Sequence, residues 1–167
     1  MGNIESEIEK KFGRKLRLRV NGLLVEQDKV LLIKHRMAED RYFWNLPGGG
    51  MEYGADVASN LQREFLEETG LEVEVEDFMF VYEFLEPPLH AVELFFEVKR
   101  MRGSLGLGTD PELSRENQIM TRLEFLSLEE VDKIEEEEKH RMLWKINSLD
   151  DIRKRKGYFY FGNYCIK

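Results

Sequence analysis

Three glutamates, Glu64, Glu67 and Glu68, are spaced so that one helix would place their carboxylates on the same side. They would repel one another, and they stand near a helix end at Gly70, where the macrodipole disfavours each anion by ~0.3–1 kcal/mol. Hard divalent cations bind clustered carboxylate oxygens, and Mg²⁺ is held by a few carboxylates together with substrate phosphates. The cluster therefore indicates a divalent-metal site, although this pattern alone is more often a solvated helix face.

A run of three glycines, Gly48 to Gly50, precedes this helix. Without side chains, this backbone can approach a ligand or a metal closely. Arg63 stands one turn before Glu67 and could hold its carboxylate in a salt bridge. A glycine run or an acidic helix is common by itself, but the two in this order form a more specific signal.

The spacing resembles the box of the Nudix hydrolase family, G-x5-E-x7-R-E-U-x-E-E-x-G-U, where U is a bulky apolar residue. Residues 49–71 match every defined position except one, where Ala55 stands in place of the first glutamate. The flanking residues 43–47 and 121–131 also resemble the family, so the likeness covers residues 17–131.

The resemblance implies an α/β fold, a Nudix-like α/β/α sandwich with a mixed β-sheet. It also implies an enzyme that uses Mg²⁺ or Mn²⁺ and an attacking water to cleave a diphosphate linked to another moiety. By position, the expected metal ligands are the Gly48 carbonyl, Glu64, Glu67 and Glu68, and Arg63 would orient a carboxylate. These three glutamates and Arg63 are the expected catalytic residues.

Two points remain open within this resemblance. The general base is either a box glutamate or an acid from a later loop, and Glu116, just before the last expected strand, is preferred to Glu112. The loss of the first box glutamate at Ala55 weakens the expected metal affinity, and Glu52, three residues earlier, could partly replace it.

Cationic and aromatic residues upstream are candidate substrate contacts. Two neighbouring strands could bring basic side chains to the phosphates, although a solvated strand face explains them equally well. Trp44 could stack on a base or pack in the core. The candidate substrate-binding residues are Arg17, Arg19, Arg36 and Trp44, with Lys34 beside them.

Hydropathy patterns predict the elements that position these residues. A helix is expected over residues 56–69, capped by Asp56 or by Gly54 just before it and ended by Gly70, and a capping box at Ser127 starts another. A further helix should carry Met142, Leu143 and Ile146. Strands are expected at residues 15–20, 22–25, 30–33, 71–75, 78–82, 92–98, 123–126 and 158–161, with Glu93 and Glu97 opposite the apolar face of residues 92–98.

Length and composition limit the remaining possibilities. The 167 residues suit a single domain, with residues 1–14 as an N-terminal extension and residues 132–167 as a C-terminal helix and aromatic tail. No apolar run could span a membrane, and the polar start and single Cys165 favour a cytoplasmic protein. Of the net charge of −8, residues 129–138 contribute −6, so nucleic-acid binding is not expected. The three histidines show no metal-binding spacing.

The leading hypothesis is a pyrophosphohydrolase of a small nucleotide-like substrate, with a homodimer possible. Pro87, 16 residues after Leu71, resembles members that cleave ADP-sugars, so ADP-ribose or nucleotide sugars stand beside nucleoside triphosphates and dinucleoside polyphosphates. An isopentenyl diphosphate isomerase would need a cysteine in the early catalytic loop, where this chain has none. The alternative is a catalytically weak Nudix-fold ligand-binding or regulatory domain, which Ala55 favours.

Overall fold

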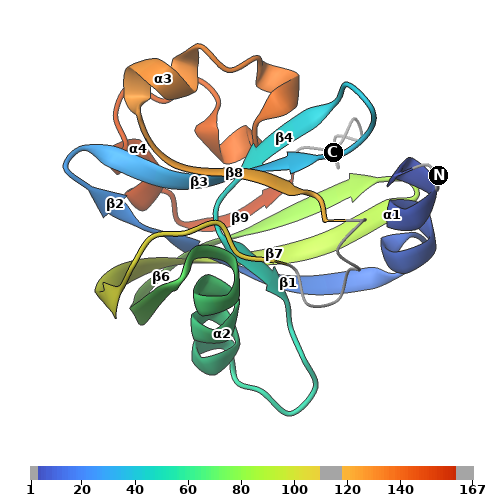
Figure 1. Cartoon of the computed structure of the whole chain (residues 1–167), viewed down its shortest axis with the longest axis horizontal. Coiled ribbons are helices and arrows are strands. Elements are labelled where there is room, and N and C mark those ends of the chain that lie inside the picture. Colours follow the sequence, from blue (N-terminus) through green and yellow to red (C-terminus); the bar gives the residue numbers. More distant parts are fainter. Residues whose placement is uncertain (1–3, 110–117, 161–167) are drawn as a thin grey trace.

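Two β-sheets and the helices around them make up the computed structural model, which describes residues 4–109 and 118–160 (Figure 1). The five-stranded sheet has the order β5-β1-β7-β6-β9, and in the second sheet β3 pairs with β2, β4 and β8. The first sheet is mixed, because β1 runs parallel to β7 but antiparallel to β5. The expected mixed-sheet α/β fold is therefore confirmed. The strands are β1 Leu16–Leu23, β2 Val25–Glu26, β3 Lys29–Arg36, β4 Tyr42–Asn45, β5 Gly48–Gly50, β6 Leu71–Glu86, β7 Leu89–Gly103, β8 Met120–Ser127 and β9 Gly157–Tyr160.

The helices cover the outer faces of the two sheets. In Figure 1, α2 lies below the five-stranded sheet, and α3 and the segments after it lie above the second sheet. The α-helices are α1 Ile4–Phe12, α2 Val57–Thr69, α3 Leu128–Asp132 and α4 Asp150–Arg153, with 3-10 turns at Glu136–Glu138 and Arg141–Leu143. Within the described residues, no helix is both long and apolar enough to cross a membrane.

The helix that carries the glutamates begins and ends as its sequence predicts. Asp56 is the N-cap of α2, and its Oδ1 accepts a hydrogen bond of 2.8 Å from the Ser59 N–H. Gly70 ends the helix in the left-handed conformation, with φ of 71°, and its N–H donates to the Leu66 carbonyl. Leu61 and Phe65 are fully buried against β1 and β7, which fixes the rotation of α2 and therefore the direction of its glutamates.

Strand β7 departs from the expected pattern of one buried and one polar face. Leu94, Phe96 and Val98 pack toward α2, as expected, but the opposite face is also covered. There Phe95 stacks on Phe80, and Glu93 is only 5 % exposed. A central strand with layers on both sides buries both of its faces, so alternation along it does not identify a solvent side.

The segment after α3 also differs from its prediction. Instead of one helix through Met142, Leu143 and Ile146, the chain makes a 3-10 turn that ends at Leu143, and Lys145 has φ of 51°. The three apolar side chains are nevertheless buried in the core between the sheets. The predicted helix through these residues is therefore wrong: apolar spacing also arises where a 3-10 turn and irregular chain bury the same side chains.

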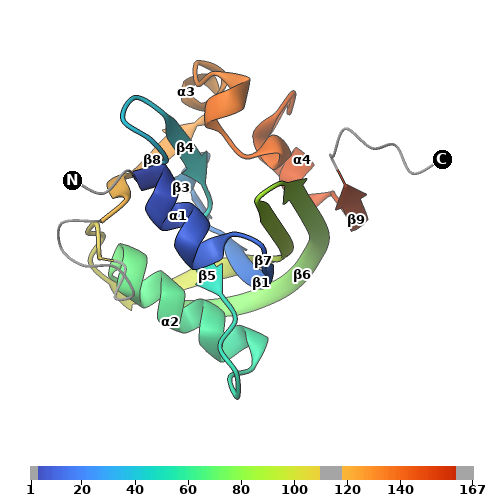
Figure 2. The same cartoon turned by 90° about the vertical axis from the view of Figure 1, so that its right-hand side faces the viewer.

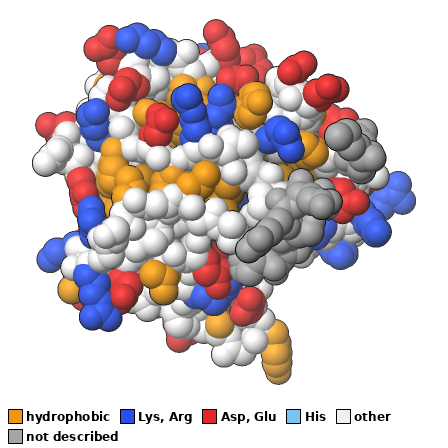
Figure 3. Space-filling model, in the orientation of Figure 1, with side chains coloured by type: hydrophobic (Ala, Val, Ile, Leu, Met, Phe, Trp, Pro, Cys, Tyr) orange, Lys and Arg blue, Asp and Glu red, His pale blue; other side chains and the backbone are white. Residues whose placement is uncertain are grey.

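At the other end of the chain, α1 bridges the two sheets (Figure 2). Glu5 forms an ion pair of 3.5 Å with Arg41 in the loop before β4, and the Phe12 ring lies 4.0 Å from the Arg17 guanidinium on β1. On the face drawn in Figure 3, acidic and basic side chains are interspersed, and no continuous basic patch is seen among the residues coloured by type.

Candidate functional site

The glycine strand β5 and the acidic helix α2 meet through Gly48 and Glu68. The Gly48 N–H donates a hydrogen bond of 2.9 Å to Glu68 Oε2, and the carboxylate is buried. Pairing of Gly48 with Asn21 on β1 fixes the position of the glycine. The predicted neighbourhood of the glycines and the helix is therefore present in the structure.

A single guanidinium balances the other two glutamates of the cluster. Arg63 Nη2 lies 2.7 Å from Glu64 Oε1, and Arg63 Nη1 lies 2.8 Å from Glu67 Oε2. The predicted Arg63–Glu67 salt bridge is confirmed. Glu52, the suggested substitute for the missing box glutamate, lies 3.4 Å from Arg63 Nη2. Because Arg63 holds several acids at once, it sets where their oxygens point.

Gly49 is the position where close approach decides the residue type. A Cβ built on Gly49 would lie 2.3 Å from the Glu64 Cδ and 2.4–2.5 Å from its oxygens. Any side chain there would displace the carboxylate. Burial raises the pKa of Glu64 above its usual range, and the charge of Glu67 adds to this, although Arg63 opposes both. A cation next to Glu64 would stabilise the charged carboxylate and so lower this pKa again.

The donors in this cluster suit a divalent metal ion by their chemistry, since carboxylate and carbonyl oxygens are hard ligands. In the structure, however, the three carboxylates face other protein groups and not a shared point. Glu68 faces the Gly48 N–H, while Glu64 and Glu67 face Arg63. Accordingly, across residues 4–109 and 118–160, no three His, Cys, Asp or Glu side chains are gathered closely enough to hold an ion. Metal binding here would need carboxylates to exchange these partners for the ion.

Asn60, which was not singled out in the sequence, ties the loop before α2 to β5. It is 1 % exposed, its Oδ1 accepts a hydrogen bond of 3.0 Å from the Glu52 N–H, and its Nδ2 donates to the Gly50 carbonyl at 3.0 Å. Ala55 lies in the same loop, directly before the Asp56 cap. An asparagine next to the apolar stripe of an amphipathic helix was the available signal, because a polar side chain on the buried side of a helix needs a hydrogen-bonding partner.

Arg19 comes to the site from β1. Its Nη2 donates a hydrogen bond of 3.3 Å to the Gly48 carbonyl, and its Nε lies 3.4 Å from Glu93 Oε1. Behind it, Glu93 Oε2 lies 3.0 Å from His140 Nε2, and the Asn21 amide approaches Glu93 Oε1 at 3.4 Å. Glu93 and His140 belong to no spaced motif, so the sequence does not mark them as site residues. Two acids in the strand at residues 92–98, Glu93 and Glu97, were the available signal, and the sequence does not distinguish the buried acid from the partly exposed one.

Comparison with known proteins places this geometry in a family. Residues 15–145 match the family model described as the NUDIX domain. The chain belongs to the Nudix family. The matched residues include β5, α2, Arg19, Glu93 and His140, so the box and the buried charges behind it lie in one Nudix domain.

Two curated relatives share parts of this Nudix chain. The human 8-oxo-dGDP phosphatase NUDT18 is 48 % identical over 60 residues, which are 36 % of this chain and 19 % of that protein. The ADP-ribose pyrophosphatase of Methanocaldococcus jannaschii is 33 % identical over 93 residues, 54 % of this chain and 55 % of that protein. The similarity therefore spans about a fifth of the first relative and about half of the second.

A solved structure supports the same fold. The NUDIX hydrolase from Nitrosomonas europaea superimposes with a TM-score of 0.60 at 21 % identity, covering 71 % of this chain and 76 % of that one.

The remaining predicted residues of the Nudix site are spread over the fold. Trp44 is 5 % exposed in the core between the sheets, which agrees with the packing alternative rather than with stacking on a substrate. Arg36 ends β3 in the second sheet, where its N–H bonds to the Ile119 carbonyl. Arg17 lies on β1 against Phe12. Glu112 and Glu116 lie outside the described residues.

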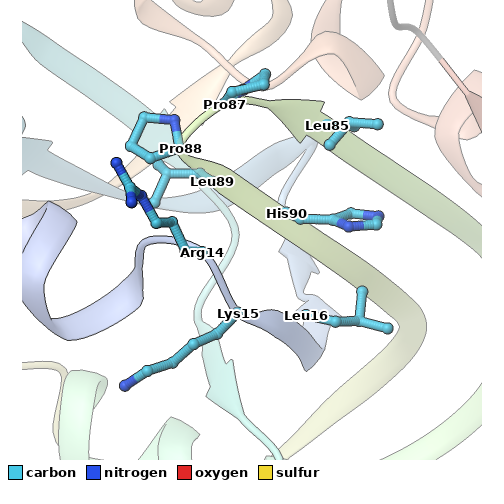
Figure 4. Close-up of a pocket in the computed structure, with 8 residues that line it drawn as sticks. All are labelled: Arg14, Lys15, Leu16, Leu85, Pro87, Pro88, Leu89 and His90. Atoms are coloured by element: carbon cyan, nitrogen blue, oxygen red, sulfur yellow. The ribbon is translucent and has the colours of Figure 1, made fainter.

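A separate hollow lies at the β6–β7 turn (Figure 4), and none of the box glutamates lines it. Its volume is about 530 Å³, and none of the predicted site residues lines it. His90 on its wall is held by Glu83, 2.7 Å away. The hollow is lined by Arg14, Lys15, Leu16, Leu85, Pro87, Pro88, Leu89 and His90.

Proposed function

We propose that this Nudix protein is a divalent-metal-dependent hydrolase that cleaves the pyrophosphate bond of a nucleoside diphosphate linked to another moiety. The observation that carries the proposal is the packing of the acidic face of α2 against the glycines of β5. Glu68 is buried and Glu64 fills the space left by Gly49. Burial of carboxylates is costly, and a helix face that served only solubility would leave them in water.

In this proposal the box residues bind the metal ion and keep its ligands in place. Mg²⁺ or Mn²⁺ would be held by Glu64, Glu67, Glu68 and the Gly48 carbonyl. Such an ion neutralises the diphosphate and acidifies a bound water. Arg63 would keep the carboxylates in place, as its bonds of 2.7 and 2.8 Å to Glu64 and Glu67 suggest.

Other groups would handle the substrate and the proton. Arg19, which already faces the Gly48 carbonyl, would bind a substrate phosphate. The base that takes the proton from water is proposed to be Glu116, with Glu112 second. Arg17 and Arg36 are retained as weaker candidates for substrate contacts. The chain would act as a single Nudix-like domain.

The substrate class is proposed to be nucleoside diphosphates carrying a further group. One relative is named for ADP-ribose, in which ADP carries a further ribose, and the other is named for 8-oxo-dGDP, a nucleoside diphosphate without a further group. ADP-ribose and nucleotide sugars are therefore tested first, together with 8-oxo-dGDP, nucleoside triphosphates and dinucleoside polyphosphates.

The test is hydrolysis of this panel with product identification, in Mg²⁺, in Mn²⁺ and in EDTA. Glu68→Gln should lower turnover by about a hundredfold or more, because it removes a ligand and its charge from the metal. The matched control is Glu72→Gln, an exposed acid paired with Arg102 outside the site, which should leave turnover unchanged. Full turnover in EDTA, or in the Glu68 variant, would refute the mechanism.

A second function rests on one observation, the alanine at position 55. With one box carboxylate missing, the domain could bind a nucleotide and cleave it slowly or not at all. The same panel distinguishes the two functions. Binding of a nucleotide measured by calorimetry, without product after long incubation in Mg²⁺ and Mn²⁺, would favour the ligand-binding domain over the hydrolase.

A further inference from the structure

Glu93 is a buried acidic residue, and burying a carboxylate costs free energy. It lies in the middle of β7, 5 % exposed, and both of its oxygens have partners. Burial raises its pKa, but the hydrogen bond and charge of His140, the charge of Arg19 and the amide of Asn21 outweigh burial and leave the pKa below its usual range. Glu93 is therefore a buried carboxylate held between charged and hydrogen-bonding partners, and removing one member of such a pair leaves an uncompensated buried charge.

The neighbour that Glu93 holds is set by strand pairing. β1 lies between β5 and β7, so that Arg19 is opposite Gly50 on one side and Glu93 on the other. The guanidinium thus extends from its contact with Glu93 toward the glycine strand and reaches the Gly48 carbonyl at 3.3 Å. Glu93 anchors one end of a group whose other end lies at the box.

The contact with Glu93 leaves most of the hydrogen-bonding capacity of Arg19 unused. An arginine has five donor hydrogens. Among the described residues, Nε has an ion-pair distance to Glu93 but no aligned hydrogen bond, and Nη2 donates to Gly48. A guanidinium that is positioned by an ion pair and still has unused N–H donors can bind a phosphate, because phosphate oxygens accept two parallel hydrogen bonds.

We infer that Glu93, supported from behind by His140, is a positioning residue that holds Arg19 beside Gly48 to receive a phosphate of the substrate. This inference rests on the proposed function. It adds a role for a residue outside the box and joins the segment around His140 to the site. The aromatic rings of Tyr82 and Phe95, 4.5 and 5.4 Å from the His140 ring, fix that support in place.

The test compares Glu93→Gln with a matched control on the same strand. Glu97 also pairs with an arginine, at 2.6 Å from Arg153 Nε, but that pair lies away from the box. The probe is α,β-methylene-ADP, a diphosphate that the hydrolase cannot cleave, titrated calorimetrically in Mg²⁺. Glu93→Gln should raise the Kd by about tenfold, whereas Glu97→Gln should change it by less than about twofold.

A double variant distinguishes a positioning role of Glu93, exerted through Arg19, from a general structural role of Glu93. If Glu93 acts through Arg19, adding Glu93→Gln to Arg19→Met should not raise the Kd further. In turnover assays, the loss should appear in KM more than in kcat, and Glu93→Asp, which keeps the charge, should recover part of the affinity. Glu93→Asp also keeps the test valid if Glu93→Gln fails to fold, since a shortened carboxylate should still weaken the probe.

Several results would overturn the inference. They are an unchanged Kd in folded Glu93 variants, fully additive effects of Glu93→Gln and Arg19→Met, or no binding of the probe to the wild type. If the wild type binds the probe with the expected coupling but cleaves no compound of the panel, the positioning role stands and the proposed hydrolysis fails.

Discussion

Adding one methyl group at Gly49 tests whether the position of Glu64 matters. In Gly49→Ala the new Cβ would lie 2.3 Å from the Glu64 carboxyl carbon, about 1 Å inside the shortest ordinary contact of 3.4 Å. The backbone at Gly49 needs no left-handed conformation, so the effect is steric. The adjacent Gly50→Ala is the control, because its Cβ would meet only Arg17 Nη2, at an ordinary 3.9 Å.

The size of the effect follows from the contact that is lost. Moving Glu64 by about 1 Å breaks its bond of 2.7 Å to Arg63. A hydrogen bond between charged groups contributes about 1.5–3 kcal/mol, and partial exposure of Arg63 favours the lower end. For a chain of this length, about 1.5 kcal/mol corresponds to a fall in Tm of about 3–6 °C. If Glu64 holds the metal as proposed, a displacement of this size should lower turnover by up to about a hundredfold.

The assays are thermal denaturation in EDTA and hydrolysis as a function of Mg²⁺ concentration, for the wild type and both variants. Gly50→Ala should stay within about 0.5 kcal/mol of the wild type and keep its turnover. If Gly49→Ala behaves like Gly50→Ala in both assays, Glu64 can move without loss, and its contact with the glycine strand has no functional meaning.

Three further predictions concern the elements around the site. Asp56→Ala should lower the melting temperature in thermal denaturation, because it removes the cap of α2, while Ser59→Ala, which keeps that hydrogen bond, should lower it less. Ala55→Glu should preserve or raise turnover at limiting Mg²⁺, and a large loss would mean that the chain uses the space at this position otherwise. Burial, and then the charge of Arg19, lower the pKa of His35 from 6.5 to about 4, so the unfolded chain takes up a proton first as the pH falls. Between pH 6.5 and 4, stability should therefore fall by up to about 1.4 kcal/mol per pH unit from this group, and chemical denaturation of His35→Gln should give a flatter profile.

The sequence was most informative where local chemistry decides local structure. The cap at Asp56, the stop at Gly70 and the capping box of Ser127 with Glu130 are all present, because each depends on residues within one turn. The salt bridge from Arg63 to Glu67 follows from the same short spacing.

The sequence was least informative where distant segments meet. The acidic cluster was expected to be destabilising through repulsion, but the sequence could not reveal that the Gly48 N–H would face Glu68. Likewise, the partners of Glu93 come from β1 and from the segment after α3, and no spacing along the chain brings Arg19 and His140 together. Their meeting could be predicted only from the pairing of β1 with both β5 and β7, which the sequence does not show.

That double pairing makes β1 intolerant of changes in length. Its residues align the glycine strand on one side and the Glu93 strand on the other. An insertion or deletion of one residue in β1 would turn every side chain beyond it to the opposite face, so that Arg19 would point toward α2 while the box remained intact. In homologues and in engineered variants, length variation should therefore be absent from β1 and tolerated in the exposed loop at residues 52–54.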